Sequence, residues 1–308
     1  MILTVTLNPA YDMTYRVQNF EPGRAHQVSA VEQRVGGAGI NVTRILNQLG
    51  KYSRATGFAD HQFAAAAERE LPADFVHALP WVRRTVVVNE CDDGTATSLS
   101  EPGARISGLD AVDQLLVRVT GLLGDSSAVV VSGSLPAGIR SSIPAELARL
   151  AGAAGIPVIC DVQGRALELA AAVPGVVLMP DLDELERVIG TRPDTTAEIA
   201  DAAGALVEDG ADAVIVTRGA AGMVAATRAG AWSAALPTPC SGNPTGAGDA
   251  AAAAVISALA APGQPDWPDI LTDAVATSAA AVVMAVAGEI DLSVRQRLIS
   301  DVLIEKVS

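Results

Sequence analysis

Residues 243–249 form a loop of small and polar residues that leads directly into an alanine-rich run, 250–261, which predicts a helix. A helix that starts from such a loop leaves several backbone N–H groups unpaired, and the helix dipole adds partial positive charge where they converge. This point is suited to binding an anion. Because Asp249 is the last loop residue, the same turn supplies a carboxylate that could take a proton from a hydroxyl. The combination indicates phosphoryl transfer to an alcohol.

The loop alone admits a simpler interpretation, in which Asp249 only caps the helix or complements its dipole. The loop is not a Walker A sequence, since no Gly-Lys-Ser/Thr ends it. It is not a dinucleotide-binding fingerprint either, because the third glycine is missing and no strand leads directly into it. Residues elsewhere in the chain are needed to choose between a structural and a chemical role.

The composition favours one large α/β domain with an appendage over two small domains. The chain has 308 residues, of which 50% are apolar and only 3% aromatic, so its core must consist of Ala, Val, Leu and Ile. Such residues suit parallel strands covered by helices. The formal net charge of −14 argues against nucleic acid or an anionic membrane as a general partner.

Cysteine usage and apolar runs predict a cytoplasmic protein. The 3 cysteines are far apart and odd in number, which fits a reduced protein without a metal cluster. Residues 1–5 read as a first strand and not as a signal peptide. The longest apolar runs, 250–261 and 279–287, fall short of the roughly 18 residues of a membrane span.

Hydrophobic patterns predict a doubly wound, mostly parallel sheet flanked by helices, since strands and helices alternate along most of the chain. Expected strands are 2–7, 128–131, 157–160, 176–179 and 213–216, and expected helices are 41–49, 109–123, 142–154, 182–189 and 197–208. Two inserts at about 11–35 and 84–100, the second with a turn at 92–94, alternate polar and apolar residues and are expected to form a small sheet beside this single domain.

Polar residues follow several of the expected strands. In a doubly wound sheet, ligands bind outside the carboxyl ends of the strands. The residues at these positions are Asn8, Asp12, 132–134, Asp161, Asp181, Glu184 and 217–219.

Seven short segments, in this order, resemble the ribokinase-like (PfkB-type) carbohydrate kinases. Within that family they are most similar to the branch that phosphorylates sugar phosphates, which includes 1-phosphofructokinase and tagatose-6-phosphate kinase. The segments are Leu7-Asn8-Pro9-Ala10-Tyr11-Asp12, Gly36-Gly37-Ala38-Gly39-Ile40-Asn41-Val42, Glu101-Pro102-Gly103, Ser132-Gly133-Ser134-Leu135-Pro136, Asp181-Leu182-Asp183-Glu184-Leu185, 216–222 and 243–249.

The resemblance implies that Asp249 is the base that takes the proton from the sugar hydroxyl. It also implies that Gly246, Ala247 and Gly248 stabilise the transferring γ-phosphoryl group with their N–H groups. These roles agree with the chemistry inferred from the loop itself.

The resemblance further implies an acceptor site. Asp12 and Asn41 would bind sugar hydroxyls, with close backbone approach at Gly37. Arg84 and Ser134 would contact the phosphate that the substrate already carries, and a guanidinium suits this task because it can hold two phosphate oxygens. Arg84 could instead be a solvated charge on a strand, and the adjacent Arg83 could serve in its place.

For the donor site, the resemblance implies ATP with Mg²⁺. Asp181 and Glu184 would organise the metal, although acidic residues are also common in a first helical turn. Thr217, Gly219 and Gly222 would line the nucleotide site. The resemblance also implies a homodimer that forms by pairing of the small sheets, which act as lids.

The sequence departs from the family at four places. Ala38 replaces a lysine that many members of this branch carry, which removes one cation from the sugar pocket. Asp181 replaces an asparagine and adds negative charge near the ATP phosphates. Met179 replaces a lysine, and residues 250–251 replace a Ser-Phe pair.

The leading hypothesis is ATP-dependent phosphorylation of a sugar phosphate, with fructose 1-phosphate giving fructose 1,6-bisphosphate as the first candidate. Alternatives are a kinase of tagatose 6-phosphate, fructose 6-phosphate, an unphosphorylated sugar or a nucleoside. A catalytically weak protein that binds nucleotide or sugar phosphate is an alternative of another class. An NAD-dependent dehydrogenase is disfavoured, since no glycine fingerprint follows the first strand.

Overall fold

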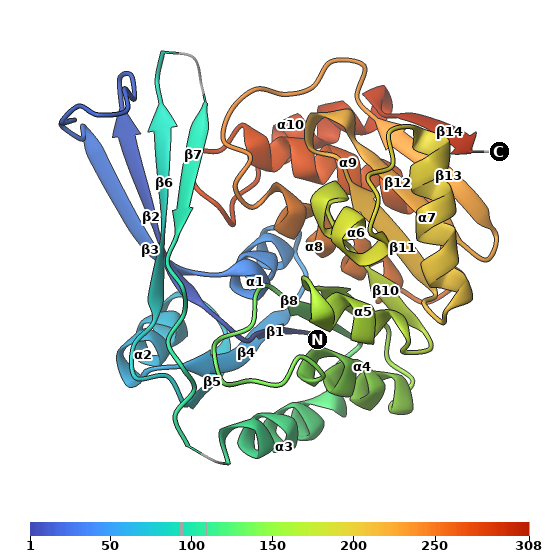
Figure 1. Ribbon diagram of the computed structural model, residues 1–308, viewed down its shortest axis with the longest axis horizontal. Coiled ribbons are helices and arrows are strands. Elements are labelled where there is room, and N and C mark those ends of the chain that lie inside the picture. Colours follow the sequence, from blue (N-terminus) through green and yellow to red (C-terminus); the bar gives the residue numbers. More distant parts are fainter. Residues whose placement is uncertain (93–94, 109, 308) are drawn as a thin grey trace.

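The computed structural model describes residues 1–92, 95–108 and 110–307. They form a large sheet covered by helices on both faces, with a smaller sheet that projects from one side (Figure 1). The expected turn at 92–94 includes Asp93 and Gly94, which lie outside the described residues. No described helix is long and apolar enough to cross a membrane.

In the described part of the chain, the large sheet has ten strands. They are β1 (Ile2–Thr6), β4 (Ser53–Ala59), β5 (Ala73–His77), β8 (Ala128–Ser132), β9 (Val158–Asp161), β10 (Val176–Leu178), β11 (Ala213–Thr217), β12 (Met223–Thr227), β13 (Gly230–Ala235) and β14 (Leu303–Val307). Their order is β14-β13-β12-β11-β10-β9-β8-β1-β4-β5. Pairing is parallel from β5 through to β11, while β12, β13 and β14 form an antiparallel edge.

The helices divide between the two faces of this sheet. One face packs against α2 (His61–Glu70), α3 (Ala111–Leu123), α4 (Ile143–Ala153), α5 (Arg165–Ala171), α6 (Leu182–Ile189) and α7 (Thr196–Glu208). The other packs against α1 (Ala38–Gln48), α8 (Ala247–Leu259), α9 (Trp267–Val282) and α10 (Leu292–Leu298). Strand residues alternate between the two cores, so that Leu3 lies in the first and Ile2 in the second.

Helix α8 is buried on all sides between the sheet, α1 and α9. Residues 250–256 are at most 1% exposed, and their small side chains let the neighbouring backbones approach closely. The helix begins at Ala247, three residues before the expected start, because Gly246 is already its N-cap. Ala247, Gly248 and Asp249 are therefore the first helical turn and not the end of a loop.

The chain order reverses between the neighbouring strands β1 and β8. From β1 the sheet continues outward to β4 and β5, and from β8 it continues the other way to β9, β10 and β11. Such a reversal opens a crevice at the carboxyl ends of the two strands, where ligands bind in doubly wound sheets. The fold thus places the segments after β1 and β8 at a ligand site.

The small sheet contains β2 (Ala10–Val17), β3 (Ala30–Gly36), β6 (Arg83–Glu90) and β7 (Ala96–Ser100), in the order β3-β2-β6-β7. These strands come from the two inserts that the sequence pattern marks. β2 pairs in parallel with β6, and the outer pairs are antiparallel. Directly opposite residues share a face, which places Asp12, Arg34 and Thr85 on one side of the sheet.

Candidate active site

Two helix N-termini meet at Asp249. Asn41 lies in the first turns of α1, and its Nδ2 donates a hydrogen bond of 2.9 Å to Asp249 Oδ2 in the first turn of α8. The N-caps of both helices are glycines, Gly37 and Gly246, without a capping side chain. Each helix therefore starts without a side-chain cap for its N–H groups, although Ala247 N donates to Pro244 O at 3.1 Å, and the two partial positive charges converge on one region.

Glycine is required at both caps. Gly246 has a φ of 85°, and a Cβ atom there would lie 3.0 Å from Ala287 Cβ. Gly37 has a φ of 103°, and a Cβ atom there would lie 3.0 Å from Pro9 Cα. Left-handed or related backbone geometry with this crowding excludes other residues. The same geometry brings the backbone N–H groups close to any bound anion.

Asp249 lies in an environment that disfavours its charge. Burial raises the pKa of the Asp249 carboxyl to about 8, and the nearby carboxylates of Asp161 and Asp12 add to the increase, against the hydrogen bond from Asn41. A carboxylate with an elevated pKa is a stronger base than an ordinary aspartate. Asp249 is thus suited to take a proton from a hydroxyl.

Asp12 links the small sheet to this centre. It lies in β2, is only 8% exposed, and accepts hydrogen bonds from Asn41 and from the backbone of Gly37. Burial raises the pKa of Asp12 to about 6, although the Arg83 guanidinium opposes the shift. A buried, polar pair of Asp12 and Asn41 beside Asp249 can hold the hydroxyl groups of a small polar ligand.

A first cavity of about 560 Å³ lies at the carboxyl ends of β1 and β8, and Asp12 and Asn41 are not part of its lining. Asn8 Nδ2 donates a 3.0 Å hydrogen bond to Ser134 Oγ in its wall. Arg83 also lines the cavity, and Glu101 and Gln163 complete its polar lining.

The structure places Arg83 and Arg84 on opposite faces of the small sheet, because successive residues of a strand alternate. Arg83 lies opposite Ala10, on the Asp12 side, and its guanidinium donates to Asn8 O at 3.4 Å. Arg84 is exposed and lies outside the cavity lining. Of the two arginines that the sequence offers for a substrate phosphate, only Arg83 therefore borders this cavity.

A second cavity of about 500 Å³ is mostly apolar and borders the first turn of α8 at Ala247. Its lining includes Gly219, Gly222, Ala247, Val275 and Ala279. Residues 95–96 of the small sheet reach its rim. A flat heterocycle such as a nucleobase fits such an apolar slot.

Three carboxyl groups surround a smaller cavity of about 240 Å³, which Thr217 and Gly248 also line. Asp181 caps α6 and Glu184 completes a capping box with it, so both have the structural role expected of acids at a helix start. Asp161 accepts a 2.8 Å hydrogen bond from Ser132. Burial raises the pKa of Glu184 to about 7 and that of Asp161 to about 6.

Burial of these neighbouring carboxyl groups disfavours their charge, and a bound cation would favour it. Among the described residues, no three acidic, histidine or cysteine side chains are close enough to hold a metal by themselves. Mg²⁺ typically keeps several waters and binds one or two carboxylates together with substrate phosphates. The cavity with Asp161, Asp181 and Glu184 fits a metal held in this way.

The first turn of α8 borders both the apolar cavity and the carboxylate cavity. Ala247 borders the apolar cavity, Gly248 borders the carboxylate cavity, and Asp249 is bonded to Asn41 beside Asp12. Thr217 borders the carboxylate cavity and not the apolar one.

Sequence analysis assigned no role to three residues that line these cavities. Asn8 and Asp161 were placed after strands, at positions where ligands bind, but without a chemical role. Gln163 carries no comparable signal, because it lies in the loop after Asp161.

The chain matches the pfkB family of carbohydrate kinases over residues 5–289. It is similar in structure to a possible 1-phosphofructokinase from Thermotoga maritima, with 27% identity, a TM-score of 0.90 and coverage of 100% of both chains. The tetrameric inhibited form of phosphofructokinase-2 from Escherichia coli is 26% identical, with a TM-score of 0.85 and coverage of 97% of this chain and 98% of that one. Arabidopsis thaliana ribokinase complexed with ribose and ATP shares the fold, at 20% identity, a TM-score of 0.70 and coverage of 96% and 98%.

Proposed function

Because the chain belongs to the pfkB family of carbohydrate kinases, we propose that it transfers the γ-phosphoryl group of ATP to a hydroxyl of a sugar phosphate. Fructose 1-phosphate, which would give fructose 1,6-bisphosphate, is the first candidate acceptor. The observation that carries this proposal is the position of Asp249, a carboxyl with a pKa raised to about 8 in the helix turn that borders two cavities.

In the proposed reaction the apolar cavity holds the adenine of ATP, and the phosphates of ATP lie over the first turn of α8. The N–H groups of Gly246, Ala247 and Gly248 stabilise the charge that develops on the γ-phosphoryl oxygens. Asp249 accepts the proton of the acceptor hydroxyl as its oxygen forms the new bond to phosphorus. The bond to the β-phosphate oxygen breaks, and ADP leaves.

Asp181 and Glu184 would hold Mg²⁺ together with the nucleotide phosphates, with Asp161 in the same cavity, and the bound ion would neutralise charge on the phosphate oxygens. Of these, Asp181 is exposed and Glu184 is partly buried. Without a cation the three carboxylates repel an incoming triphosphate. Nucleotide binding should therefore require the metal.

The acceptor would bind with its hydroxyls at Asp12 and Asn41, above Gly37, and with its own phosphate in the first cavity. Arg83 is the cation available there, and Ser134 and Asn8 provide further polar contacts. Charge-assisted hydrogen bonds from a guanidinium to phosphate contribute about 1.5–3 kcal/mol each. We therefore assign the phosphate contact to Arg83 in place of Arg84.

A kinase of an unphosphorylated sugar is the second candidate. It is favoured by the Glu101 side chain, which lines the same cavity as Arg83, and by Ala38, which supplies no cation. A negative charge at this position opposes a phosphorylated acceptor.

The test is a kinase assay with purified protein, Mg-ATP and separate acceptors, in which ADP release and the sugar product are measured. The acceptors are fructose 1-phosphate, fructose 6-phosphate, tagatose 6-phosphate, fructose and ribose. We expect the highest kcat/KM with a ketohexose phosphate, and a loss of about two to four orders of magnitude in kcat with the Asp249→Asn variant. Higher kcat/KM with a free sugar would support the second candidate. Binding of ATP without turnover of any acceptor would identify a binding protein and reject the kinase proposal.

We also propose that two copies of the chain associate through the outer faces of their small sheets. Val31 and Leu99 lie on the face opposite Asp12 and are 54% and 59% exposed. Apolar side chains on an open sheet favour association. By sedimentation we expect a dimer that Leu99→Glu dissociates. Val117→Glu, at a 74% exposed position on α3, should leave it intact; a monomeric wild type would reject the proposal.

A further inference from the structure

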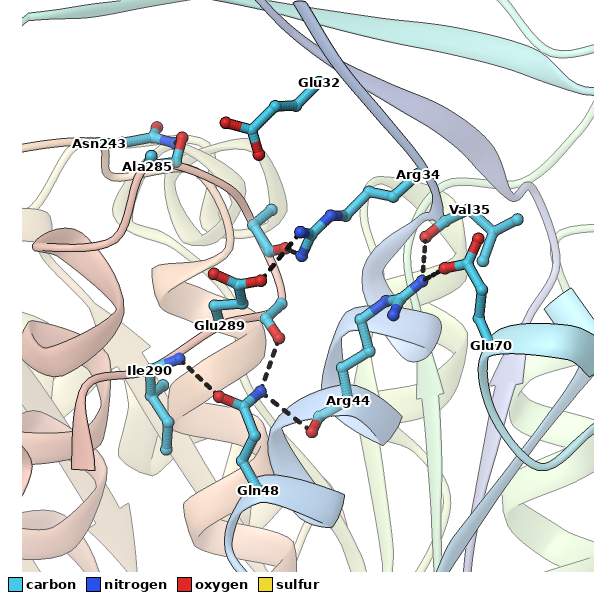
Figure 2. Close-up of polar contacts among 12 residues, drawn as sticks. Glu32, Arg34, Val35, Arg44, Gln48, Glu70, Asn243, Ala285, Glu289 and Ile290 are labelled. Atoms are coloured by element: carbon cyan, nitrogen blue, oxygen red, sulfur yellow. Dashed lines mark hydrogen bonds and ion pairs between the residues drawn. The ribbon is translucent and has the colours of Figure 1, made fainter. Parts of the chain in front are cut away.

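The segment 285–290, between α9 and α10, packs against residues at the starts of α1 and α8, and we call it the brace. Figure 2 shows side chains from separate elements reaching it. Gln48 of α1 donates to Gly288 O at 2.9 Å and accepts from Ile290 N at 3.1 Å. The brace has no regular secondary structure of its own over most of its length, so its conformation depends on these contacts.

The brace packs against both helix starts that form the catalytic centre. Ala287 is the residue that excludes a side chain at Gly246, the cap of α8. Gly288 has a φ of 78°, and a Cβ atom there would lie 3.0 Å from Asn41 Oδ1. A shift of the brace would therefore change the space available to both Gly246 and Asn41.

The small sheet holds the brace at two points. Arg34 of β3 forms an ion pair with Glu289, with 2.9 Å between Nη2 and Oε1, and its Nη1 donates to Ala287 O at 3.5 Å (Figure 2). Asn89 of β6 donates to Ala285 O at 2.9 Å. Asn243 of the loop before α8 donates to the same carbonyl oxygen, at 3.1 Å.

Arg34 connects the small sheet, which carries Asp12, to the brace. It lies opposite Asp12 in the sheet register, and its side chain is only 21% exposed. Both partners are in the brace: the Glu289 carboxylate, and the carbonyl oxygen of Ala287, the residue that packs on Gly246. The contact thus joins β3, which pairs with the strand that carries Asp12, to the segment that packs on Gly246, the N-cap of the helix that carries Asp249.

We propose that Arg34 is a positioning residue for phosphoryl transfer, which acts through the brace and touches neither substrate. This inference rests on the proposed function. Transfer requires the acceptor hydroxyl, held from the small sheet, to meet the phosphoryl group, held by α8, in one geometry. A misplacement of about 1 Å can cost about 100-fold in rate, even when both substrates still bind.

The test compares Arg34→Ala with Arg16→Ala. Arg16 is a matched control, because it also lies in the small sheet and forms an ion pair of 2.9 Å, with Glu32, but does not contact the brace. We expect Arg34→Ala to lower kcat about 10- to 100-fold, with the KM for ATP within about twofold of the wild type. Arg34→Lys, which keeps the charge, should recover part of the loss, and Glu289→Gln, which keeps an acceptor, should lose less than Glu289→Ala.

A second readout does not depend on turnover. Hydrogen–deuterium exchange of the peptide that spans 243–250 should be faster in Arg34→Ala than in Arg16→Ala and the wild type. Unchanged exchange there, or equal kcat in the two alanine variants, overturns the inference. If the wild type phosphorylates no acceptor, the proposed function fails, and the exchange experiment still decides whether Arg34 holds the loop before α8.

Discussion

Replacement of Asp249 by asparagine should make the protein more stable at alkaline pH while it removes activity. The folded state raises the pKa of Asp249 from 3.8 to about 8. Between these values the folded protein keeps the proton and the unfolded chain releases it, so stability falls as pH rises through this range. Asparagine carries no charge and can still accept the hydrogen bond from Asn41. The stability of the Asp249→Asn variant therefore lacks this dependence on pH.

The size of the effect follows from the shift. A change from 3.8 to about 8 is about four pKa units, and at about 1.4 kcal/mol per unit the upper limit is about 6 kcal/mol. Asp249 as a whole residue is only half-buried, and part of the shift comes from the charges of Asp161 and Asp12. We therefore expect Asp249→Asn to gain about 2–3 kcal/mol at about pH 8.5 and less than about 0.5 kcal/mol at about pH 4.

The assay is urea unfolding of metal-free protein without nucleotide, at several pH values from about 4 to about 8.5. Asp269→Asn is the matched control, because Asp269 occupies the same position in the first turn of α9 but is exposed. It should show no gain that grows with pH. A difference between Asp249→Asn and the wild type that stays constant with pH would refute the reasoning. In the kinase assay, Asp249→Asn should lose about two to four orders of magnitude in kcat.

Five further substitutions, in three experiments, test the rest of the site. Arg83→Ala should raise the KM for a phosphorylated acceptor about tenfold or more without changing ATP binding, whereas Arg84→Ala should change neither; the reverse result in steady-state kinetics would restore Arg84. Asp181→Asn should bind ATP better at low Mg²⁺, while Glu184→Gln should lower activity at every Mg²⁺ concentration, and an unchanged Mg²⁺ dependence in calorimetric titration would leave Asp181 as a helix cap only. Gly246→Ala should destabilise the protein by at least about 1–2 kcal/mol in urea unfolding and lower kcat, because alanine resists the φ of 85°; normal stability and kcat would contradict the required geometry.

The parallel core could be predicted from the sequence because its signals are local. Each strand from β8 to β11 is a short apolar run. The helices between these strands show the helical spacing of apolar residues, which can be recognised within one segment of sequence. The segment 53–77 carries β4, α2 and β5 without a prediction, because its apolar residues are interrupted by Gly57 and by charged side chains. The antiparallel edge at 223–235 was also missed, since its alanine-rich strands resemble helix in composition.

The candidate site was predictable in part for the same reason. Asp249 could be predicted because it stands at the start of an alanine-rich helix. Its contact with Asn41 follows once the fold brings the starts of α1 and α8 together. The choice between Arg83 and Arg84 depends on which face of β6 turns toward Asp12, and one residue of register reverses it. The contacts of Arg34 with the brace join residues far apart in the chain, and no local pattern encodes them.

The parallel pairing of β2 with β6 also bears on how the chain folds during synthesis. β2 leaves the ribosome early, but its parallel partner β6 appears only after α1, β4, α2 and β5 have been made. Pairing of strands so distant in sequence carries a loop-closure cost and tends to be slow. The pairing of β2 with β6 is therefore expected to follow the local antiparallel pairing of β2 with β3 and of β6 with β7.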